Sequence, residues 1–302
     1  MDMPISSRAA SQLLPDGTRM GEVHLAVTDA DRALAVWRDV VGLTLLARDG
    51  DTLRLGAGDR TLIVLHVEAK TPTAQRALGL YHVAIHVPER RDLARFVMRA
   101  VKAGMRVSPT DHLVTEAVYL WDLDGIGIEL TFETPWRGSV GSTVSGAYAT
   151  TADGKPHSGR EAIDLDDLMA ERDGDPTPDA VLPEGTRIGH VHVHVNDLDV
   201  AMKFYAGTLG FEPLVLMRDW GMGDAGLGYM PHAIAFNIWA GANARRPPEG
   251  SAGLKWFEMH VPAAARADIA ARLSAAGAPG ADIGGHLEIA DPSGNRLRLV
   301  FD

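Results

Sequence analysis

The chain has 302 residues, of which 46% are hydrophobic and 23% charged, so we expect a folded globular protein of about two ordinary domains. Its 29 basic and 40 acidic residues give a formal charge of −11, which repels polyanions and argues against a nucleic-acid partner. The absence of cysteine excludes disulfides, thiolate metal sites and cysteine nucleophiles, so any metal must be held by histidine and carboxylate. No window has the apolar length of a signal peptide or a membrane span, and we expect a cytoplasmic protein without a membrane partner.

Two strand and helix patterns follow each other in the first half of the chain. Residues 23–27 alternate like a half-buried strand, residues 29–41 have helical spacing after capping residues, and residues 48–67 are typical of further strands. The pattern then restarts, with a strand at 80–87, a helix at 90–103, and strands around 114–121 and 126–132. Each pattern is therefore one βαβββ module.

The second half of the chain repeats the first. The segment GEVHLAVTDADRA at Gly21 recurs as GHVHVHVNDLDVA at Gly189, with several identities in the same register. Two later blocks repeat at similar spacing, so the chain holds four modules. One module exposes an apolar sheet face and cannot bury it alone, so two modules must pair. We predict an α+β fold of four βαβββ modules, paired into two open, cup-shaped mixed-sheet barrels.

Four segments describe the expected domain organisation. Residues 138–184 are rich in Gly, Ser, Thr, Asp and Pro, and only residues 162–172 have helical spacing, as in a linker. The predicted segments are an N-terminal extension at 1–19, a two-module domain with the metal site at 20–136, a linker at 137–185, and a two-module domain with a degenerate site at 186–302.

Two histidines and one glutamate fall at matching places in the first two modules. His24 and His82 lie in the first strands of their modules, and Glu129 lies in the last strand of the second. If these two modules lie side by side, the three side chains meet in the cup. Two histidines and one carboxylate leave three coordination positions open and suit non-haem Fe(II), with Mn(II) as the alternative. A lone strand histidine is more often a core or edge residue, but three residues at matching positions favour a metal site.

The stretch between residues 110 and 129 carries a family resemblance. Thr110-Asp111-His112, Val118-Tyr119, Asp122, Gly125 and Glu129 closely resemble the signature of the type I extradiol ring-cleaving dioxygenases, with Leu123 in place of the signature's proline. These enzymes belong to the vicinal oxygen chelate superfamily, whose βαβββ modules match the repeat. The resemblance to the two-domain catechol 2,3-dioxygenase type covers essentially the whole chain, including the linker segment at 164–168.

The resemblance implies an enzyme that opens a catecholic ring and inserts both atoms of O2. It implies that the iron ligands are His24, His82 and Glu129. His112 and Tyr119 fall on the signature's active-site histidine and tyrosine, and His66 fits a further family histidine. In that scheme His66 serves as base, His112 stabilises charge on the reduced oxygen, and Tyr119 orients the substrate. The better-known members carry the site in their C-terminal half, so this chain resembles a reversed arrangement.

The second half retains little of this set. His192 matches His24, but Trp256 and Arg298 stand at the positions of His82 and Glu129. Because a cation at a ligand position repels a metal ion, we predict no metal there. Five histidines of this half are then expected to be structural or residual: His190, His192, His194, His260 and His286.

Two other functions stay open at this point. A glyoxalase-like isomerase or lyase uses the same modules but usually needs four protein ligands, and a metal-free binding protein needs an aromatic cleft without the triad. The expected partners are a small aromatic diol and O2, and exposed edge strands suggest a homo-oligomer, with a dimer as the first expectation. The sequence leaves the particular diol and the choice between Fe and Mn undecided.

Overall fold

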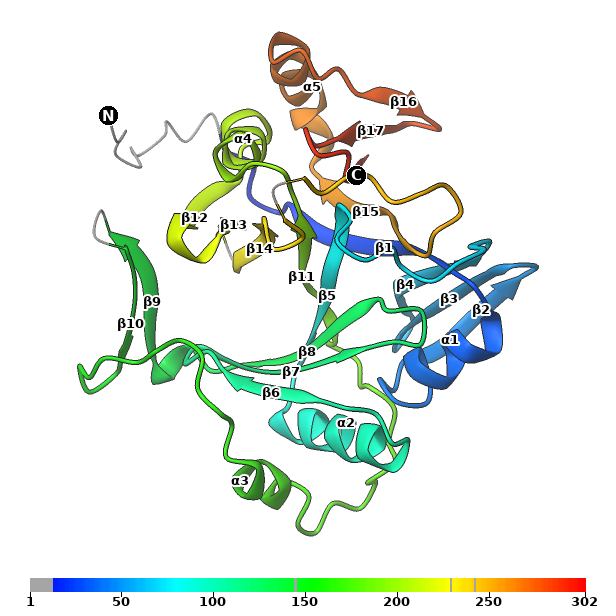
Figure 1. Ribbon diagram of the computed structural model, residues 1–302, viewed down its shortest axis with the longest axis vertical. Coiled ribbons are helices and arrows are strands. Elements are labelled where there is room, and N and C mark those ends of the chain that lie inside the picture. Colours follow the sequence, from blue (N-terminus) through cyan, green and yellow to red (C-terminus); the bar gives the residue numbers. More distant parts are fainter. Residues whose placement is uncertain (1–12, 144–145, 229, 242) are drawn as a thin grey trace.

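The computed structural model describes residues 13–143, 146–228, 230–241 and 243–302. Most of the expected N-terminal extension, residues 1–12, lies outside this range. No helix in the described ranges is long and apolar enough to cross a membrane. The described chain confirms the predicted α+β fold, with four βαβββ modules and a linker between the second and the third (Figure 1).

The modules follow one element order. The first comprises β1 (Arg19–Val27), α1 (Ala30–Trp37), β2 (Thr44–Asp49), β3 (Thr52–Ala57) and β4 (Arg60–Val67). The second comprises β5 (Gly79–Val87), α2 (Arg90–Lys102), β6 (Ser108–Asp111), β7 (Thr115–Trp121) and β8 (Gly127–Glu133). The third comprises β11 (Arg187–His194), α4 (Leu198–Met202) continued by a π-helix (Lys203–Leu209), β12 (Glu212–Met217), β13 (Met222–Leu227) and β14 (Met230–Asn237). The fourth comprises β15 (Gly253–Val261), α5 (Arg266–Ala275), β16 (Ala281–Ile283), β17 (His286–Ala290) and β18 (Arg296–Phe301).

The modules pair across the two halves of the chain. One eight-stranded sheet has the order β16-β17-β18-β15-β1-β4-β3-β2, and the other has the order β12-β13-β14-β11-β5-β8-β7-β6. Strands β1 and β15 run side by side at the centre of the first sheet, as do β5 and β11 in the second (Figure 1). The expectation of separate two-module domains at 20–136 and 186–302 is therefore corrected. The first strands of homologous modules offer similar hydrogen-bonding edges, so the repeat itself does not determine which modules pair.

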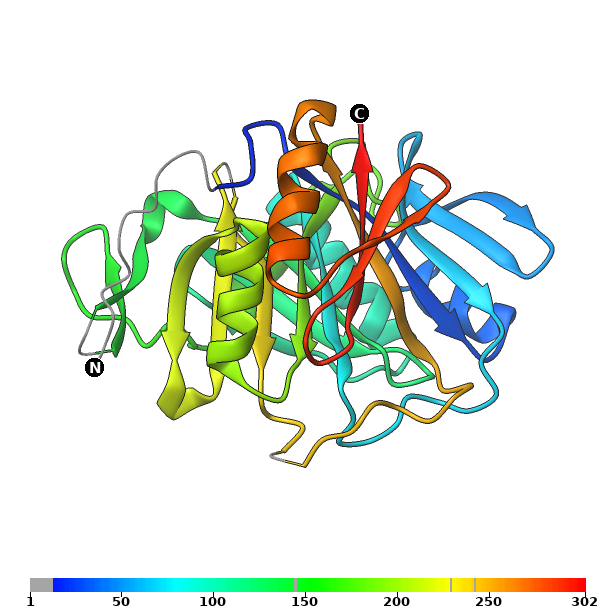
Figure 2. The same cartoon turned by 90° about the horizontal axis from the view of Figure 1, so that it is seen from above.

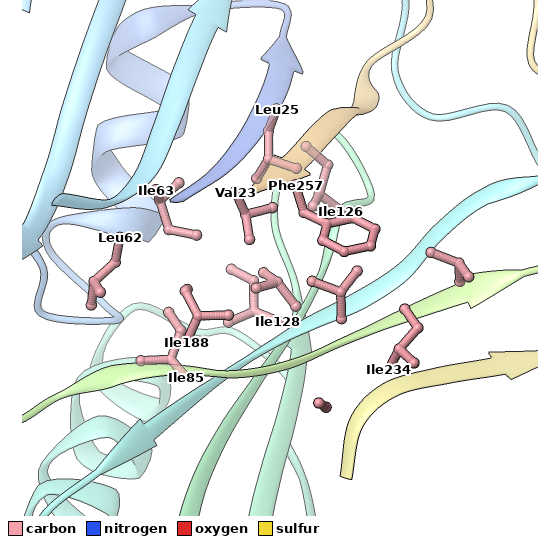
Figure 3. Packing of buried hydrophobic residues seen from close by; sticks show 14 of the residues in the cluster. Val23, Leu25, Leu62, Ile63, Ile85, Ile126, Ile128, Ile188, Ile234 and Phe257 are labelled. Carbon is pink, nitrogen blue, oxygen red and sulfur yellow. The ribbon is translucent and has the colours of Figure 1, made fainter. Parts of the chain in front are cut away.

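One apolar core lies between the two sheets. Val23 and Leu25 of β1 and Phe257 of β15 approach Ile85 of β5 and Ile128 of β8 (Figure 3). All five side chains are completely buried. Because successive side chains in a strand point to opposite faces, the residues between these apolar ones point away from the core. Each sheet therefore has an outer face on the side opposite the other sheet, and this face carries the histidines.

The linker is an ordered part of the molecule across its described residues. It contains a short helical turn (Pro135–Arg137), the hairpin β9 (Gly138–Thr143) and β10 (Gly146–Thr151), and α3 (Leu165–Ala170). The last of these lies within the helix predicted at 162–172. Arg95 of α2 donates to Asp175 at 2.7 Å, which ties the linker to the second module. The linker hairpin stands away from the main body at the side of β12 (Figures 1 and 2).

Candidate metal centre

Three buried side chains on the outer face of the β5–β11 sheet bring their ligand atoms together. His82 lies on β5, Glu129 on β8 and His190 on β11, and each is less than 5% exposed. Oε2 of Glu129 is 2.8 Å from Nε2 of His82 and 3.1 Å from Nε2 of His190. The two Nε2 atoms are 3.0 Å apart. The three atoms thus form a nearly equilateral triangle.

The triangle fits a metal ion. Ligand atoms that bind one ion at right angles, with bonds of about 2.1 Å, lie about 3.0 Å apart, so these three atoms match one face of an octahedron. Oε2 of Glu129 is buried and makes no hydrogen bond to any described residue, as expected for an oxygen whose partner is an ion. Burial acts to raise the pKa of Glu129, but His190 and His82 outweigh it and hold the pKa well below its usual value. The carboxylate is therefore ionised and available as a ligand.

The ligand set expected from the sequence is corrected at one position. His82 and Glu129 come together as expected, but His24 lies on β1 in the other sheet. His24 and His82 are on the outer faces of two sheets that pack back to back, so they point away from each other. The third member of the triangle is His190, which the sequence analysis assigned to a structural role. The expectation that His190 is structural or residual is therefore corrected, because its Nε2 completes the triangle.

The strands approach closely beneath the triangle because of a glycine. A Cβ on Gly127 would lie 2.0 Å from the carbonyl oxygen of Tyr81 and 3.0 Å from Cβ of His82. Only glycine therefore lets β8 pair with β5 at this point. That pairing sets Glu129 opposite Ala84, two residues beyond His82 on the same face of the sheet.

His112 and Tyr119 form a hydrogen-bonded pair next to Glu129. Nδ1 of His112 lies 2.7 Å from the carbonyl oxygen of Gly159, which can only accept, so Nδ1 carries the proton and donates. Burial lowers the pKa of His112, so the ring is neutral and its Nε2 accepts from the Tyr119 hydroxyl at 2.9 Å. Burial and then the Glu129 carboxylate raise the pKa of Tyr119 well above its usual value, and the phenol keeps its proton. The linker thus fixes the tautomer of His112.

His232 is a site residue that the sequence analysis missed. Its ring lies 4.2 Å from that of His190, edge to face, and its Nδ1 donates to Asp224 at 2.6 Å. Burial acts to lower the pKa of His232, but the Asp224 carboxylate outweighs it and raises the pKa. In the sequence, His232 is only a histidine near the start of the last strand of the third module. It points to the site only once this module is known to lie beside His82.

Another wall of the site consists of three hydrogen-bonded polar side chains and two aromatic rings. Asn237 donates from Nδ2 to Nε2 of His192 at 2.8 Å, and its Oδ1 accepts from Nδ1 of His194 at 2.7 Å. The ring of Tyr81 packs edge to face against His192 at 5.0 Å and against Trp239 at 5.2 Å. Burial, with His82 nearby, lowers the pKa of His192 well below its usual value, so this wall of the site is uncharged.

His66 does not reach the triangle. It lies on β4 in the other sheet, with Nε2 3.1 Å from Nδ1 of His24. Burial, with Lys255 and His24 nearby, lowers the pKa of His66 to about 4. The strand registers place Asn237 of the third module at the position that His66 occupies in the first. The expectation of His66 beside the metal ligands is therefore corrected, because its module belongs to the other sheet.

In the fourth module, Trp256 and Arg298 stand at the positions equivalent to His82 and Glu129, as the repeat predicts. The guanidinium of Arg298 stacks over the Trp256 ring at 3.5 Å and donates from Nε to Glu288 at 2.7 Å. Trp256 in turn stacks on His24 at 4.2 Å. A cation and an indole therefore occupy the places that carry Glu129 and His82 in the other sheet.

Known proteins share this sequence pattern and this architecture. The sequence profile of the Glyoxalase/Bleomycin resistance protein/Dioxygenase superfamily matches residues 19–130 and 187–299. A Bacillus subtilis relative, "Catechol-2,3-dioxygenase", is 31% identical over 294 residues, which cover 95% of this chain and 98% of the relative.

Two solved structures show the same fold at low sequence identity. One, a Bacillus subtilis protein provisionally described as a dioxygenase, has 13% identity and a TM-score of 0.62, with 94% of this chain and 84% of that chain covered. The other, glyoxalase I from Zea mays, has 16% identity and a TM-score of 0.56, with 94% and 92% covered. The repeat, the module architecture and the match over most of the chain agree, and the chain belongs to the glyoxalase/bleomycin resistance/dioxygenase superfamily, the vicinal oxygen chelate superfamily.

Proposed function

We propose that this protein is an extradiol dioxygenase that opens the ring of a catechol-like substrate with O2, using Fe(II) held by His82, Glu129 and His190. The single observation that carries the proposal is the buried triangle of their ligand atoms, with sides of 2.8, 3.0 and 3.1 Å. The catechol dioxygenase relative, similar over nearly the whole chain, supports the same reaction class. Mn(II) is the alternative ion, because imidazole and carboxylate ligands accept both.

His82, Glu129 and His190 would hold the ion from one side, which would leave its other side free for ligands from solution. When bound, the ion supplies a Lewis acid that lowers the pKa of the diol hydroxyls and an electron relay between diol and O2. In the overall reaction a ring carbon–carbon bond beside the diol breaks and both oxygen atoms enter the product, so no external reductant is required. The protein must hold the diol in one orientation and move its protons.

Tyr119 and His112 are placed to move a proton. The phenol lies next to Glu129 and donates to the neutral His112, whose other nitrogen is held by Gly159. A substrate oxygen near Tyr119 therefore meets a donor with a fixed direction and a histidine behind it that accepts. We propose that Tyr119 orients the substrate oxygen and that His112 receives and returns the proton.

His232 offers a second proton-handling group on the opposite side of the ligand set. Its pairing with Asp224 favours the protonated ring, so it can stabilise negative charge that develops on an oxygen atom. We propose His232 for the role that the sequence analysis gave to His66. Tyr81 and Trp239 would pack against the aromatic ring of the substrate, because both border the uncharged wall of the site.

The main alternative is a glyoxalase-like isomerase or lyase. Such an enzyme usually needs a fourth protein ligand, whereas the cluster among the described residues contains three ligand residues. Asn237 stands near the place where a fourth ligand would be expected on β14, but its amide is engaged by His192 and His194. This favours the open triad and the dioxygenase.

The test is anaerobic loading of the metal-free protein with Fe(II), followed by a screen of catechols for O2 uptake and a yellow product. The expected result is one O2 consumed per diol, with loss of turnover in Glu129→Gln. Stoichiometric metal binding without O2 uptake on any catechol would refute the dioxygenase and favour the isomerase.

A further inference from the structure

A second group of ligand-type side chains lies on the outer face of the β1–β15 sheet. Glu22 and His24 are on β1, and Glu258 is on β15. Nε2 of His24 is 3.3 Å from Oε2 of Glu22 and 3.4 Å from Oε1 of Glu258, and the three ligand atoms all lie within 4.8 Å of one another. The side chain of His24 is only 7% exposed.

Nε2 of His24 is a buried nitrogen that makes no hydrogen bond to any described residue. A protonated imidazole that paired with either carboxylate would form a charge-assisted hydrogen bond of about 2.7–2.9 Å. The observed separations of 3.3 and 3.4 Å are longer. They match the spacing of about 3.0–3.4 Å between two ligand atoms bound to one ion with bonds of about 2.1 Å.

The other nitrogen of His24 supports the same assignment. Nδ1 of His24 lies 3.1 Å from Nε2 of His66. If Nδ1 donates to His66, the lone pair of Nε2 points towards two carboxylates, an arrangement that is repulsive unless a cation lies between them. Histidines that bind metals commonly donate their second N–H in this way.

We infer that Glu22, His24 and Glu258 bind a divalent first-row transition-metal ion, at a second site separate from the His82 centre. Two carboxylates offset the charge of such an ion, and the imidazole favours it over Ca²⁺ or Mg²⁺. Arg54 contacts Oε2 of Glu22 at 3.1 Å, and Nε1 of Trp256 donates to Oε1 of Glu258 at 3.2 Å. A carboxylate oxygen has two lone pairs, so each of these oxygens can still bind an ion beside its donor.

This second ion has a structural role. It joins the first strand of the chain to the first strand of the last module, because β1 and β15 pair at the centre of their sheet. Trp256 and Arg298 stand in the places equivalent to His82 and Glu129, so this site lacks the ligand set of the His82 centre. Binding should therefore stabilise the pairing of modules one and four without supporting turnover.

The test counts Mn(II) ions bound to metal-free protein, with free Mn(II) measured by electron paramagnetic resonance. We expect two ions for the wild type, one for Glu258→Gln, one for Glu129→Gln and none for the double variant. Removing one ligand should weaken its site by at least about 100-fold. Glu68→Gln is the matched control, because Glu68 is exposed, pairs with Lys255, and should leave both ions bound. Mn(II) at about 100 times its dissociation constant should raise the Tm of Glu129→Gln by about 5 °C and leave that of the double variant unchanged.

The inference is overturned if Glu129→Gln binds no ion, or if Glu258→Gln still binds two. One further outcome distinguishes the two proposals. If the wild type binds one ion, and this ion is lost in Glu258→Gln but kept in Glu129→Gln, the second site stands and the proposed function fails. Glu22→Gln, which changes the most exposed of the three ligands, gives the same reading if Glu258→Gln does not fold.

Discussion

The His190→Asn variant distinguishes between two possible ligand sets. The structure places His190 with His82 and Glu129, whereas the sequence predicts His24 in its place. His190 has no chemical role in the ligand set expected from the sequence, but its Nε2 lies 3.0 Å from that of His82 and 3.1 Å from the Glu129 carboxylate. Apparent binding energies of about 10–16 kcal/mol for ions held by four ligands imply about 2.5–4 kcal/mol per ligand. At 1.4 kcal/mol per tenfold, this is a loss of about 60- to 700-fold in affinity.

The assay is catechol-dependent O2 uptake as a function of Fe(II) concentration. This readout follows the catalytic ion alone and is insensitive to an ion bound elsewhere. We expect the half-saturating Fe(II) concentration of His190→Asn to rise by at least about 60-fold. His260→Asn is the control, because His260 pairs with Asp302 at the surface of the other sheet. A change of less than threefold in His190→Asn would refute the triangle as the iron site.

Three further variants test the site and the fold. Tyr119→Phe removes the donor to the neighbouring histidine and should lower kcat by about 10²- to 10⁴-fold with little change in KM, as measured by steady-state O2 uptake. His86 and then Arg187 hold the pKa of Glu133 at about 2, so its ionised form stabilises the fold above pH 4.5 and this contribution is lost as the pH falls towards 2. The shift corresponds to about 3 kcal/mol in full but to about 1 kcal/mol after solvent screening of a side chain that is 41% exposed. Urea unfolding should therefore show Glu133→Gln less stable by about 1 kcal/mol at pH 7, with a smaller difference at pH 3, and an equal difference at both values would contradict the assignment. Phe257→Ala opens a cavity between the two sheets and should cost about 3–5 kcal/mol in the free energy of unfolding, and a cost below 1 kcal/mol would mean that the sheets do not share a core.

The positions of His190 and His232 show that residues which match in a sequence repeat need not lie at the same site. All four modules carry the same strand pattern, so residues that match in the repeat, such as His24 and His192, look equivalent along the chain. They become inequivalent when the modules pair, because each module shares its cup with only one other. Here His192 lies near His82 of the triangle, and His24 lies on the opposite side of the core.

The sequence by itself determined the secondary structure of this protein and its division into modules. Alternating apolar residues predicted the strands and helical spacing predicted α1 and α2, because these signals depend on neighbours within about one element. The repeat predicted four modules, because matching segments can be compared directly along the chain. The chemical type of the site was also local in origin, since His82, Glu129, His112 and Tyr119 all belong to the second module.

Only the tertiary structure decided which module completes the site. The antiparallel pairing of β5 with β11 brings His190 to His82, and the back-to-back packing of the sheets carries His24 and His66 away. This choice depends on contacts between segments about a hundred residues apart, whose competing arrangements have nearly the same hydrogen bonds and the same apolar faces. Residue patterns record which face of a strand is buried, but they do not record the strand that lies beside it.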